Sequence, residues 1–456
     1  MKLRQKAAIA IAAISLASVA GVGQANAASI GGGGASFLAN MMDICAAQYN
    51  RNTQSNTASD IVTYASVGSS SGKSGFTKGT YLFGGSESAY SAGTAPAGLV
   101  YVPLVGGAIA IGYRLDGISP AGATVRLPSE VVAKIFAGQI TKWNDPAIAA
   151  ANKATTVAKK LKSTKDGVTV SVAKKASNVQ FAVSMTSAAA KKYKNAKVTI
   201  TAATLGGESK SLYSAKSATK LSKIATYAKN TVYTVKAGKT LVGTLTTETV
   251  KDGETITFPD TAIRVVHRSD GSGTTNNFIN YLNKSHPAIW TKVTSDTYAT
   301  GFPGAALPTD GSFQSAKGNE GLASYVRDNN GSITYAELSY LEERGVKAAA
   351  VSNPAGKYVL PSPTSSAVWL DAASVDAAGL VAQNFAATAV DAYPINAVSY
   401  GLSTTAKSAD NASVKAFFTY FLDVCAPKNA AGAGYTPLTG AILAKADAQV
   451  AKINVG

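Results

Sequence analysis

The sequence is poor in the residues that build metal centres. It contains 2 cysteines and 2 histidines among 456 residues, and no His, Cys and carboxylate cluster has the spacing of metal ligands. We therefore expect no metal, no cofactor and no metallophosphatase activity. The two cysteines, Cys45 and Cys425, have two interpretations: one disulfide joining the ends of the chain in an oxidising compartment, or two small buried residues.

Beyond its N-terminus the sequence also lacks any apolar run long enough to span a bilayer. Residues 1–27 combine three basic residues, an apolar core and the small-residue site Ala25-Asn26-Ala27, which is the pattern of a secretory signal peptide. No cysteine stands near that site, so a lipid anchor there is excluded. We expect an exported protein of the periplasm, the extracellular space or the cell surface.

Acidic residues are scarce: 26 stand against 43 basic residues, for a formal net charge of +17. Residues 154–258 hold 18 lysines and 5 acidic residues, so this one segment carries +13 of that charge. Because the excess is confined to one segment of an exported chain, we exclude a general nucleic-acid-binding function.

The same segment shows short alternating strand patterns separated by Gly, Lys and Ser, which predicts a small all-β module. Strands are expected at residues 168–172, 197–201, 231–235 and 241–250. Its lysines would either solvate strand faces and protect strand edges or bind anionic polymers.

The rest of the chain alternates strand and helix patterns, which predicts an α/β architecture. Residues 99–113 form a nearly continuous apolar run, interrupted by Gly106-Gly107, as is typical of a strand buried on both faces. Helical patterns follow at residues 129–136 and 146–151.

Three loops share one design, in which a strand pattern leads through Gly and Ser or Thr into a helix pattern. At a helix N-terminus several backbone N–H groups lack intrahelical partners and lie at the positive end of the dipole, so they can hold a tetrahedral oxyanion. One such loop is more simply a helix cap, but three that converge on one cleft would form an anion site. The loops are Gly34-Ala35-Ser36-Phe37, Gly68-Ser69-Ser70 and Gly271-Ser272-Gly273-Thr274.

Charged side chains accompany these loops. Arg268 ends a predicted strand shortly before Ser272, where its planar fork could hold two oxygens of an anion. Asp270 is placed to orient Arg268, and Glu87 supplies a further carboxylate. The residues therefore add one cation, Arg268, and two carboxylates to the candidate anion loops.

Several motifs resemble the periplasmic phosphate-binding proteins of bacterial ABC importers. The resemblance runs from about residue 30 to 450 and excludes 154–258. The matching motifs are Gly33-Gly34-Ala35-Ser36-Phe37, Val67-Gly68-Ser69-Ser70, Phe83-Gly84-Gly85-Ser86-Glu87, the stretch from Ile135 through Trp143 to Pro146, Val265 to Thr275, Gly318-Asn319-Glu320-Gly321 and Gly331-Ser332-Ile333-Thr334-Tyr335.

The resemblance implies a two-lobed type II periplasmic-binding-protein fold that is hinged by crossing strands and closes on phosphate. It places lobe 1 at residues 28–104 and 375–456 and lobe 2 at 105–153 and 259–374, with 154–258 as a β-rich insertion in lobe 2. It also implies that the protein captures inorganic phosphate and delivers it to a membrane permease and ATPase, without being an enzyme.

The resemblance also implies a set of phosphate contacts, at the positions of this sequence that match the family's motifs. Two of them depart from the family pattern: Ser36 replaces the usual Thr and keeps its hydroxyl, and Glu87 replaces the usual Asp, which lengthens the reach of the carboxylate. The implied contacts are Ser36, Phe37, Ser69, Glu87, Arg268, Ser272, Gly273 and Thr274, with Asp270 supporting Arg268.

Other functions fit parts of the sequence less well. Residues 68–72 match the serine-hydrolase elbow pattern, but a triad would need His267 or His286 beside Ser70. A nucleotide P-loop would need one more residue before Gly72. The stronger alternative is a cell-surface or adhesive protein that binds anionic envelope polymers through the insertion and keeps the two-lobed fold as a scaffold.

Overall fold

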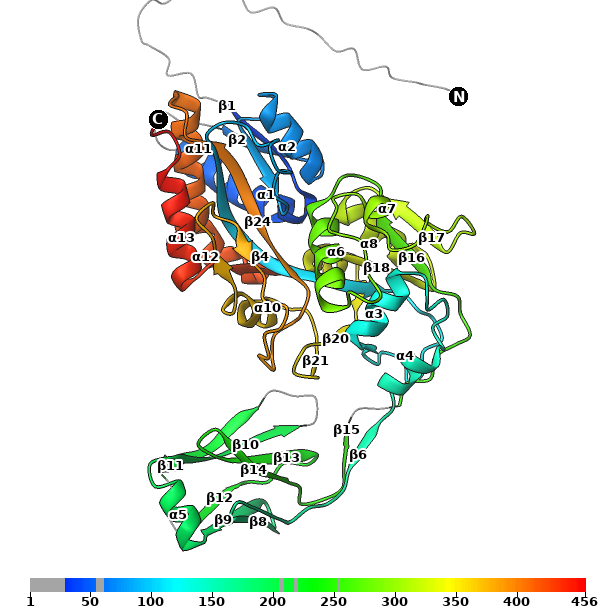
Figure 1. The fold of residues 1–456 in the computed structure, drawn as a ribbon, viewed down its shortest axis with the longest axis vertical. Coiled ribbons are helices and arrows are strands. Elements are labelled where there is room, and N and C mark those ends of the chain that lie inside the picture. The colour runs from blue at the N-terminus through cyan, green and yellow to red at the C-terminus, as the bar shows by residue number, and fades with distance from the viewer. Residues whose placement is uncertain (1–28, 55–60, 205–208, 217–219, 253–254) are drawn as a thin grey trace, which may run out of the picture.

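The computed structural model describes residues 29–54, 61–204, 209–216, 220–252 and 255–456. The predicted signal peptide, residues 1–27, lies outside these residues. Figure 1 shows two mixed lobes side by side and a third body of strands below them. The predicted two-lobed α/β fold with a β-rich insertion is confirmed, whereas the residue boundaries of the lobes stay predictions.

One ten-stranded sheet system runs through both lobes in the order β17-β16-β18-β4-β24-β3-β1-β2, with β19 and β25 also paired to β4. The first part of β4 pairs with β24, and its last part pairs with β18. The two long strands β4 and β24 therefore connect the lobes. The strands are β1 (Ser29–Gly34), β2 (Ile61–Ser66), β3 (Phe83–Ser86), β4 (Leu99–Tyr113), β16 (Arg264–Arg268), β17 (Phe313–Ala316), β18 (Ser332–Glu337), β19 (Lys347–Ala348), β24 (Asn396–Thr404) and β25 (Tyr435–Pro437).

Strand β4 is buried along its whole length after Leu99, which confirms the prediction of a strand covered on both faces. The two central glycines do not interrupt it. A Cβ at Gly107 would lie 3.0 Å from Cζ of Phe37, so glycine at this position lets the Phe37 ring lie close against the strand.

Helices cover both lobes (Figure 1). The predicted helices at 129–136 and 146–151 are confirmed with the same bounds. Helices on the β1 to β3 side are α1 (Ser36–Gln54), α2 (Ser69–Thr77), α10 (Pro363–Leu370), α11 (Ala409–Tyr420), the π-helix η1 (Phe421–Cys425), α12 (Ala426–Asn429), the 3-10 helix η2 (Ala431–Ala433) and α13 (Gly440–Ala451). Helices on the β16 to β18 side are α3 (Ser129–Phe136), α4 (Pro146–Ala151), α6 (Gly273–Ser285), α7 (Tyr298–Gly301), α8 (Gly318–Asp328) and α9 (Leu338–Glu343).

A disulfide joins Cys45 of α1 to Cys425 of η1, with the Cα atoms 5.6 Å apart. Both residues are fully buried. Of the two interpretations of these cysteines, the structure therefore contains the bridge, and it ties the first helix to a helical segment near the other end of the chain.

The insertion has a hydrophobic core of its own, built around Val170, Phe181, Tyr233 and Leu245. Its strands form two four-stranded sheets, β11-β10-β13-β14 and β12-β9-β8-β7, and the ribbon β6-β15 joins it to lobe 2. The elements are β6 (Thr155–Val157), β7 (Lys162–Lys165), β8 (Val168–Lys175), β9 (Asn178–Met185), α5 (Ser187–Lys192), β10 (Lys197–Thr204), β11 (Lys210–Lys216), β12 (Lys220–Thr226), β13 (Thr231–Ala237), β14 (Thr240–Leu245) and β15 (Val250–Asp252).

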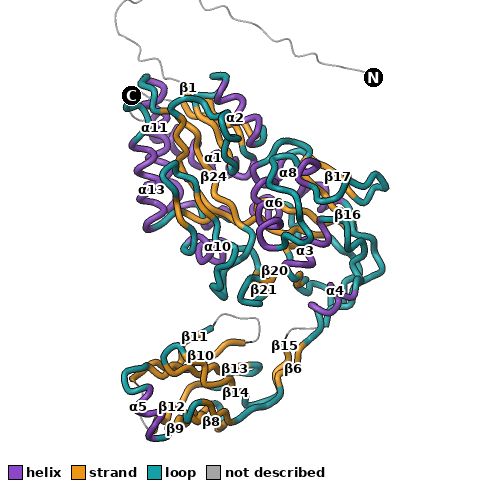
Figure 2. The backbone as a smooth tube through the Cα atoms, viewed as in Figure 1, coloured by secondary structure: helices purple, strands orange, loops and turns teal. Residues whose placement is uncertain are grey.

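Two details of the insertion differ from the prediction. Figure 2 shows a short helix, α5, among the strands; it begins where Thr186 accepts a hydrogen bond from the Ala189 N–H, a helix cap. The strand expected at 241–250 is split into β14 and β15, and Glu248 between them accepts hydrogen bonds from Tyr227 and Asn230.

Two small sheets lie outside the insertion. One has three strands, β5 (Arg126–Leu127), β20 (Ala350–Ser352) and β21 (Tyr358–Val359). The other pairs β22 (Ser374–Val375) with β23 (Val381–Ala382).

Candidate anion-binding site

The first glycine-rich loop leads from β1 into α1. Gly34 has φ of +152°, and a Cβ there would lie 2.0 Å from the Gly85 carbonyl oxygen, so only glycine allows this approach. The buried Ser36 Oγ accepts hydrogen bonds from the Asn319 backbone N–H at 3.2 Å and from Asn319 Nδ2 at 3.0 Å. The structure thus places the first residue of α1 against the start of α8 in the other lobe.

Phe37 follows in the same loop and is fully buried. Its carbonyl oxygen accepts a hydrogen bond from the Tyr435 hydroxyl at 2.7 Å, and the two rings meet edge to face. Its ring therefore fixes the start of α1 to the core of lobe 1.

The second loop lets the two lobes touch. Gly68 has φ of +88°, and a Cβ there would lie 2.4 Å from Oδ2 of Asp270. Ser69, which begins α2, is buried; its Oγ lies 3.2 Å from Oε2 of Glu87 and accepts the Gly273 N–H at 2.9 Å. One hydroxyl therefore contacts both the acidic group and the N-terminus of α6.

The third loop follows β16. The Arg268 side chain is 1% exposed, and Nε and Nη2 donate to the two oxygens of Asp270, with Nε to Oδ1 at 2.7 Å. Asp270 also accepts the Gly318 N–H at 3.1 Å. Burial alone would raise the pKa of Asp270, but the hydrogen bonds and charge of Arg268 hold that pKa below its usual value. Asp270 therefore holds the guanidinium of Arg268 in place.

At the start of α6, Ser272 acts as the helix cap: its Oγ accepts the Thr275 N–H at 3.1 Å. The neighbouring Thr274 is fully buried. Within the described part of the chain, its Oγ1 has no hydrogen-bond partner. Because a buried hydroxyl without a partner is costly, Thr274 is suited to donate to a ligand.

Glu87 is 4% exposed and lies just after β3. Oε1 accepts the Ser399 hydroxyl at 2.7 Å, and Oε2 accepts the Ser69 hydroxyl. Burial raises the pKa of Glu87 to about 7, against the lowering effects of the Ser399 hydrogen bond, the Arg268 charge and the Ser69 hydrogen bond. The carboxyl group can therefore change its protonation state near neutral pH.

These contacts bring part of the predicted set into one buried cluster. Ser69, Glu87 and Gly273 meet directly, and Thr274 follows Gly273 in α6. Arg268 connects to the same cluster through Asp270, which faces Gly68. Ser36 lies apart from the cluster: its hydroxyl is bound by Asn319, and the neighbouring Gly318 donates to Asp270.

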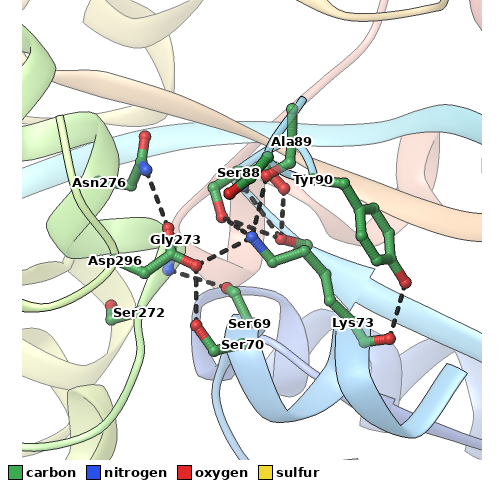
Figure 3. Close-up of polar contacts among 12 residues, drawn as sticks. Ser69, Ser70, Lys73, Ser88, Ala89, Tyr90, Ser272, Gly273, Asn276 and Asp296 are labelled. Carbon is green, nitrogen blue, oxygen red and sulfur yellow. Dashed lines mark hydrogen bonds and ion pairs between the residues drawn. The ribbon is translucent and has the colours of Figure 1, made fainter. Parts of the chain in front are cut away.

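Sequence reasoning missed the residues that join the lobes around this cluster. Figure 3 shows the carboxylate of Asp296 at the centre of one such group. Oδ2 accepts from Ser70 Oγ at 2.8 Å and lies 2.9 Å from Lys73 Nζ, and Oδ1 accepts from Asn276 Nδ2 at 2.8 Å. The Asp296 carbonyl oxygen also accepts the Ser272 N–H at 2.8 Å. No sequence motif marked Asp296.

The residues that a serine-hydrolase triad would need, Ser70 and His267, make other contacts. The Ser70 hydroxyl donates to Asp296, and His267 stacks on Tyr298 with ring centroids 4.6 Å apart. The described residues contain no group of three or more His, Cys, Asp or Glu that could hold a metal ion. Within those residues, no helix has the length and apolar character needed to cross a membrane.

Comparison with known proteins gives consistent matches. A family model described as a PBP superfamily domain matches residues 21–256 and 244–424. The phosphate-binding protein PstS of Xylella fastidiosa (strain Temecula1) is 27% identical over 405 residues, which are 87% of this chain and 78% of the relative. The phosphate-binding protein PstS of Haemophilus influenzae is 35% identical over 176 residues, 36% of this chain and 48% of the relative.

A solved phosphate-binding protein from Stenotrophomonas maltophilia has the same fold, with a TM-score of 0.53 at 17% sequence identity over 92% of this chain and 94% of the other. Together the two matches to the family model cover residues 21–424. The chain therefore belongs to the PBP superfamily, in which the relatives it matches are phosphate-binding proteins.

Proposed function

We propose that this protein is the extracytoplasmic receptor that captures inorganic phosphate and delivers it to an ABC importer. The observation that carries the proposal is the Ser69 hydroxyl, which contacts the buried Glu87 carboxylate and the N–H of Gly273 at the start of α6. A single enclosed cluster thus contains hydrogen-bond donors for an anion and one strong acceptor.

This combination suits an oxyanion that still carries a proton. The Arg268 guanidinium, the N-terminus of α6 and the Thr274 hydroxyl can donate to unprotonated oxygens. An ionised Glu87 can only accept, so it repels an anion unless the anion donates a proton to it. Hydrogen phosphate has such a proton near neutral pH and sulfate has none, so we expect the site to prefer phosphate.

The full set of proposed contacts follows the matching positions. Ser36 and Phe37 would present the N-terminus of α1, and Ser272 would add a hydroxyl that already caps α6. The proposed phosphate contacts are Ser36, Phe37, Ser69, Glu87, Arg268, Ser272, Gly273 and Thr274.

The partners of the receptor follow from the same proposal. A binding protein that serves an importer must be exported and must dock on the membrane permease that works with an ATPase subunit. The relatives are named as binding proteins, which supports delivery rather than catalysis. A purely adhesive function with the two-lobed fold as a scaffold is not favoured, because the matched relatives are named for phosphate binding.

The insertion is proposed to add an anionic partner. On β10 and β11, Lys197 lies directly opposite Lys216, and Lys236 of β13 lies opposite the nearby Thr199. All three lysines are exposed. Like charges directly opposite each other destabilise a sheet, and an anionic envelope polymer would relieve that repulsion. We propose such a polymer as the partner of this face.

Calorimetry on the mature chain, beginning at residue 28 and freed of bound anions, tests the receptor function. We expect one phosphate per chain and no heat from sulfate at pH 8. If phosphate has no Kd below about 1 mM, the proposed function is wrong.

A further inference from the structure

Glu87 and Ser399 are cross-strand neighbours that lie 312 residues apart in the sequence. Strands β3 and β24 pair antiparallel, with Ser86 opposite Tyr400. One step further along each strand, Glu87 and Ser399 face each other on the other side of the sheet. Ser399 is fully buried, and its hydroxyl donates to Oε1 of Glu87 at 2.7 Å.

Ser399 also lies at a break in the register of the strands that connect the lobes. Along β24 and β4, Ser399 pairs with Val105, but the next residue, Tyr400, pairs with Pro103. Leu104 is thus an extra residue on β4, as in a β-bulge, and Pro103 has no N–H to give to the ladder. A bulge bends and twists a strand locally, so Ser399 projects toward Glu87 from the bend where the lobes join.

The two oxygens of Glu87 have different surroundings. Oε1 faces β24, one of the strands that connect the lobes, and accepts a hydrogen bond from the Ser399 hydroxyl. Oε2 faces the anion loops: it lies 3.2 Å from Ser69 Oγ, and a Cβ added at Gly273 would lie 2.8 Å from it. The Ser399 hydroxyl on β24 thus holds Oε1 of Glu87 and leaves Oε2 turned toward the proposed ligand.

We propose that Ser399 is a specificity-determining positioning residue, which holds the carboxylate of Glu87 so that Oε2 accepts the proton of hydrogen phosphate. The inference rests on the proposed phosphate-receptor function. It also explains how a glutamate serves where the resembling family has the shorter aspartate, since the longer and more flexible side chain needs an anchor on its far oxygen.

Other charged or titratable groups near Glu87 come from four elements. Arg268 of β16 lowers the pKa of Glu87. Tyr64 of β2 and Tyr400 of β24 also lie within electrostatic reach, and burial raises the pKa of each, so both are neutral near pH 7. On α2, Lys73 is held by Ser88 and Asp296. The Ser399 hydrogen bond lowers the pKa of Glu87, so the loss of this hydroxyl would raise that pKa further.

The test compares Ser399→Ala with two controls on the same strand or position. Ser399→Thr keeps the hydroxyl. Ser403→Ala removes another fully buried hydroxyl of β24, one that has no hydrogen-bond partner among the described residues. Phosphate affinity and competition by sulfate are measured by calorimetry from pH 6 to pH 9, and thermal melting of each variant checks that it is folded.

We expect Ser399→Ala to lower the preference for phosphate over sulfate about tenfold, and to move the onset of sulfate binding about one pH unit upward. Ser399→Thr should behave as wild type, and so should Ser403→Ala. If Ser399→Ala and Ser403→Ala show the same preference and the same pH profile, the inference is overturned. If the wild type itself does not bind phosphate, the receptor function fails instead, so the two failures are distinguishable.

Discussion

Asp296 and Lys73 form an ion pair between the two lobes, with Oδ2 2.9 Å from Nζ and both side chains less than one-fifth exposed. Asp296 is also bound, through its carbonyl oxygen, to the N–H of Ser272 at the cap of α6. The pair that joins the lobes is thus attached to one of the loops proposed to hold the ligand.

Asp296→Asn should weaken phosphate binding about tenfold, because the closed arrangement loses a partly buried ion pair while the backbone contact to Ser272 remains. The wild-type affinity should also fall as salt rises, and the variant should lose part of that dependence. Calorimetry at two salt concentrations measures both. The control is Lys134→Gln, which removes an exposed ion pair with Glu130 within α3 and should change phosphate affinity little. Equal affinities for Asp296→Asn and this control would show that the pair of Asp296 with Lys73 does not stabilise contact between the lobes.

Arg268→Ala should reduce phosphate affinity by about 3 kcal/mol or more, because a buried anion would lose its guanidinium partner and Asp270 would be left without its own. Titration calorimetry measures the change, and Arg264→Ala, at the start of the same strand, serves as the control. Binding within about threefold of wild type, roughly 0.7 kcal/mol, would mean that the assigned site is wrong.

Glu87→Gln should gain measurable sulfate binding and lose preference for phosphate, because an amide can donate where a carboxylate can only accept. For the same reason, sulfate binding by the wild type should appear as the pH falls through about 7, where Glu87 becomes protonated. Competition titrations at pH 6 and pH 8 measure both effects. A Glu87→Gln variant that still discriminates fully between the anions would exclude the carboxylate as the source of selectivity.

Deletion of residues 154–258, with the ends joined by a short linker, should leave phosphate affinity within about threefold of wild type. The insertion has its own hydrophobic core, so its loss should not unpack the lobes. The same deletion should abolish salt-sensitive attachment to anionic envelope material, because it removes +13 of the formal charge. Equal retention of both proteins on such material at low salt would exclude attachment through the insertion.

Glu337 offers a test of stability against pH. This residue of β18 is fully buried, and burial raises its pKa to about 8, although the Ser339 side chain and N–H donate to it. Between about 4.5 and 8 the folded protein therefore binds more protons than the unfolded chain, so the free energy of unfolding should fall as pH rises through this window. Burial of Glu87 acts in the same direction up to about pH 7.

Urea denaturation of the ligand-free protein from pH 4 to pH 9 measures this slope. Glu337→Gln should flatten it, because the amide does not titrate. Identical slopes for the variant and the wild type would contradict a raised pKa at Glu337.

Local patterns in the sequence predicted the parts of this protein that depend on neighbouring residues. Glycine followed by serine or threonine before a helix marks a turn and a cap, and such signals located the loops at Ser36, Ser69 and Ser272. Alternating apolar residues located the strands of the insertion, and the continuous apolar run located β4. The resemblance to a known family added the assignment of Glu87 and Arg268 to one site.

The tertiary structure alone decided which distant residues meet. Ser399 reaches Glu87 across 312 positions and Asp296 reaches Lys73 across 223, and neither pair has a local signature. Their contact depends on how β4 and β24 pass between the lobes, and on the register that the bulge at Leu104 imposes. Sequence spacing thus determined where the candidate anion loops begin. Cross-strand register and the contacts between the lobes determined which side chains orient those loops, because these contacts form between segments that only folding brings together.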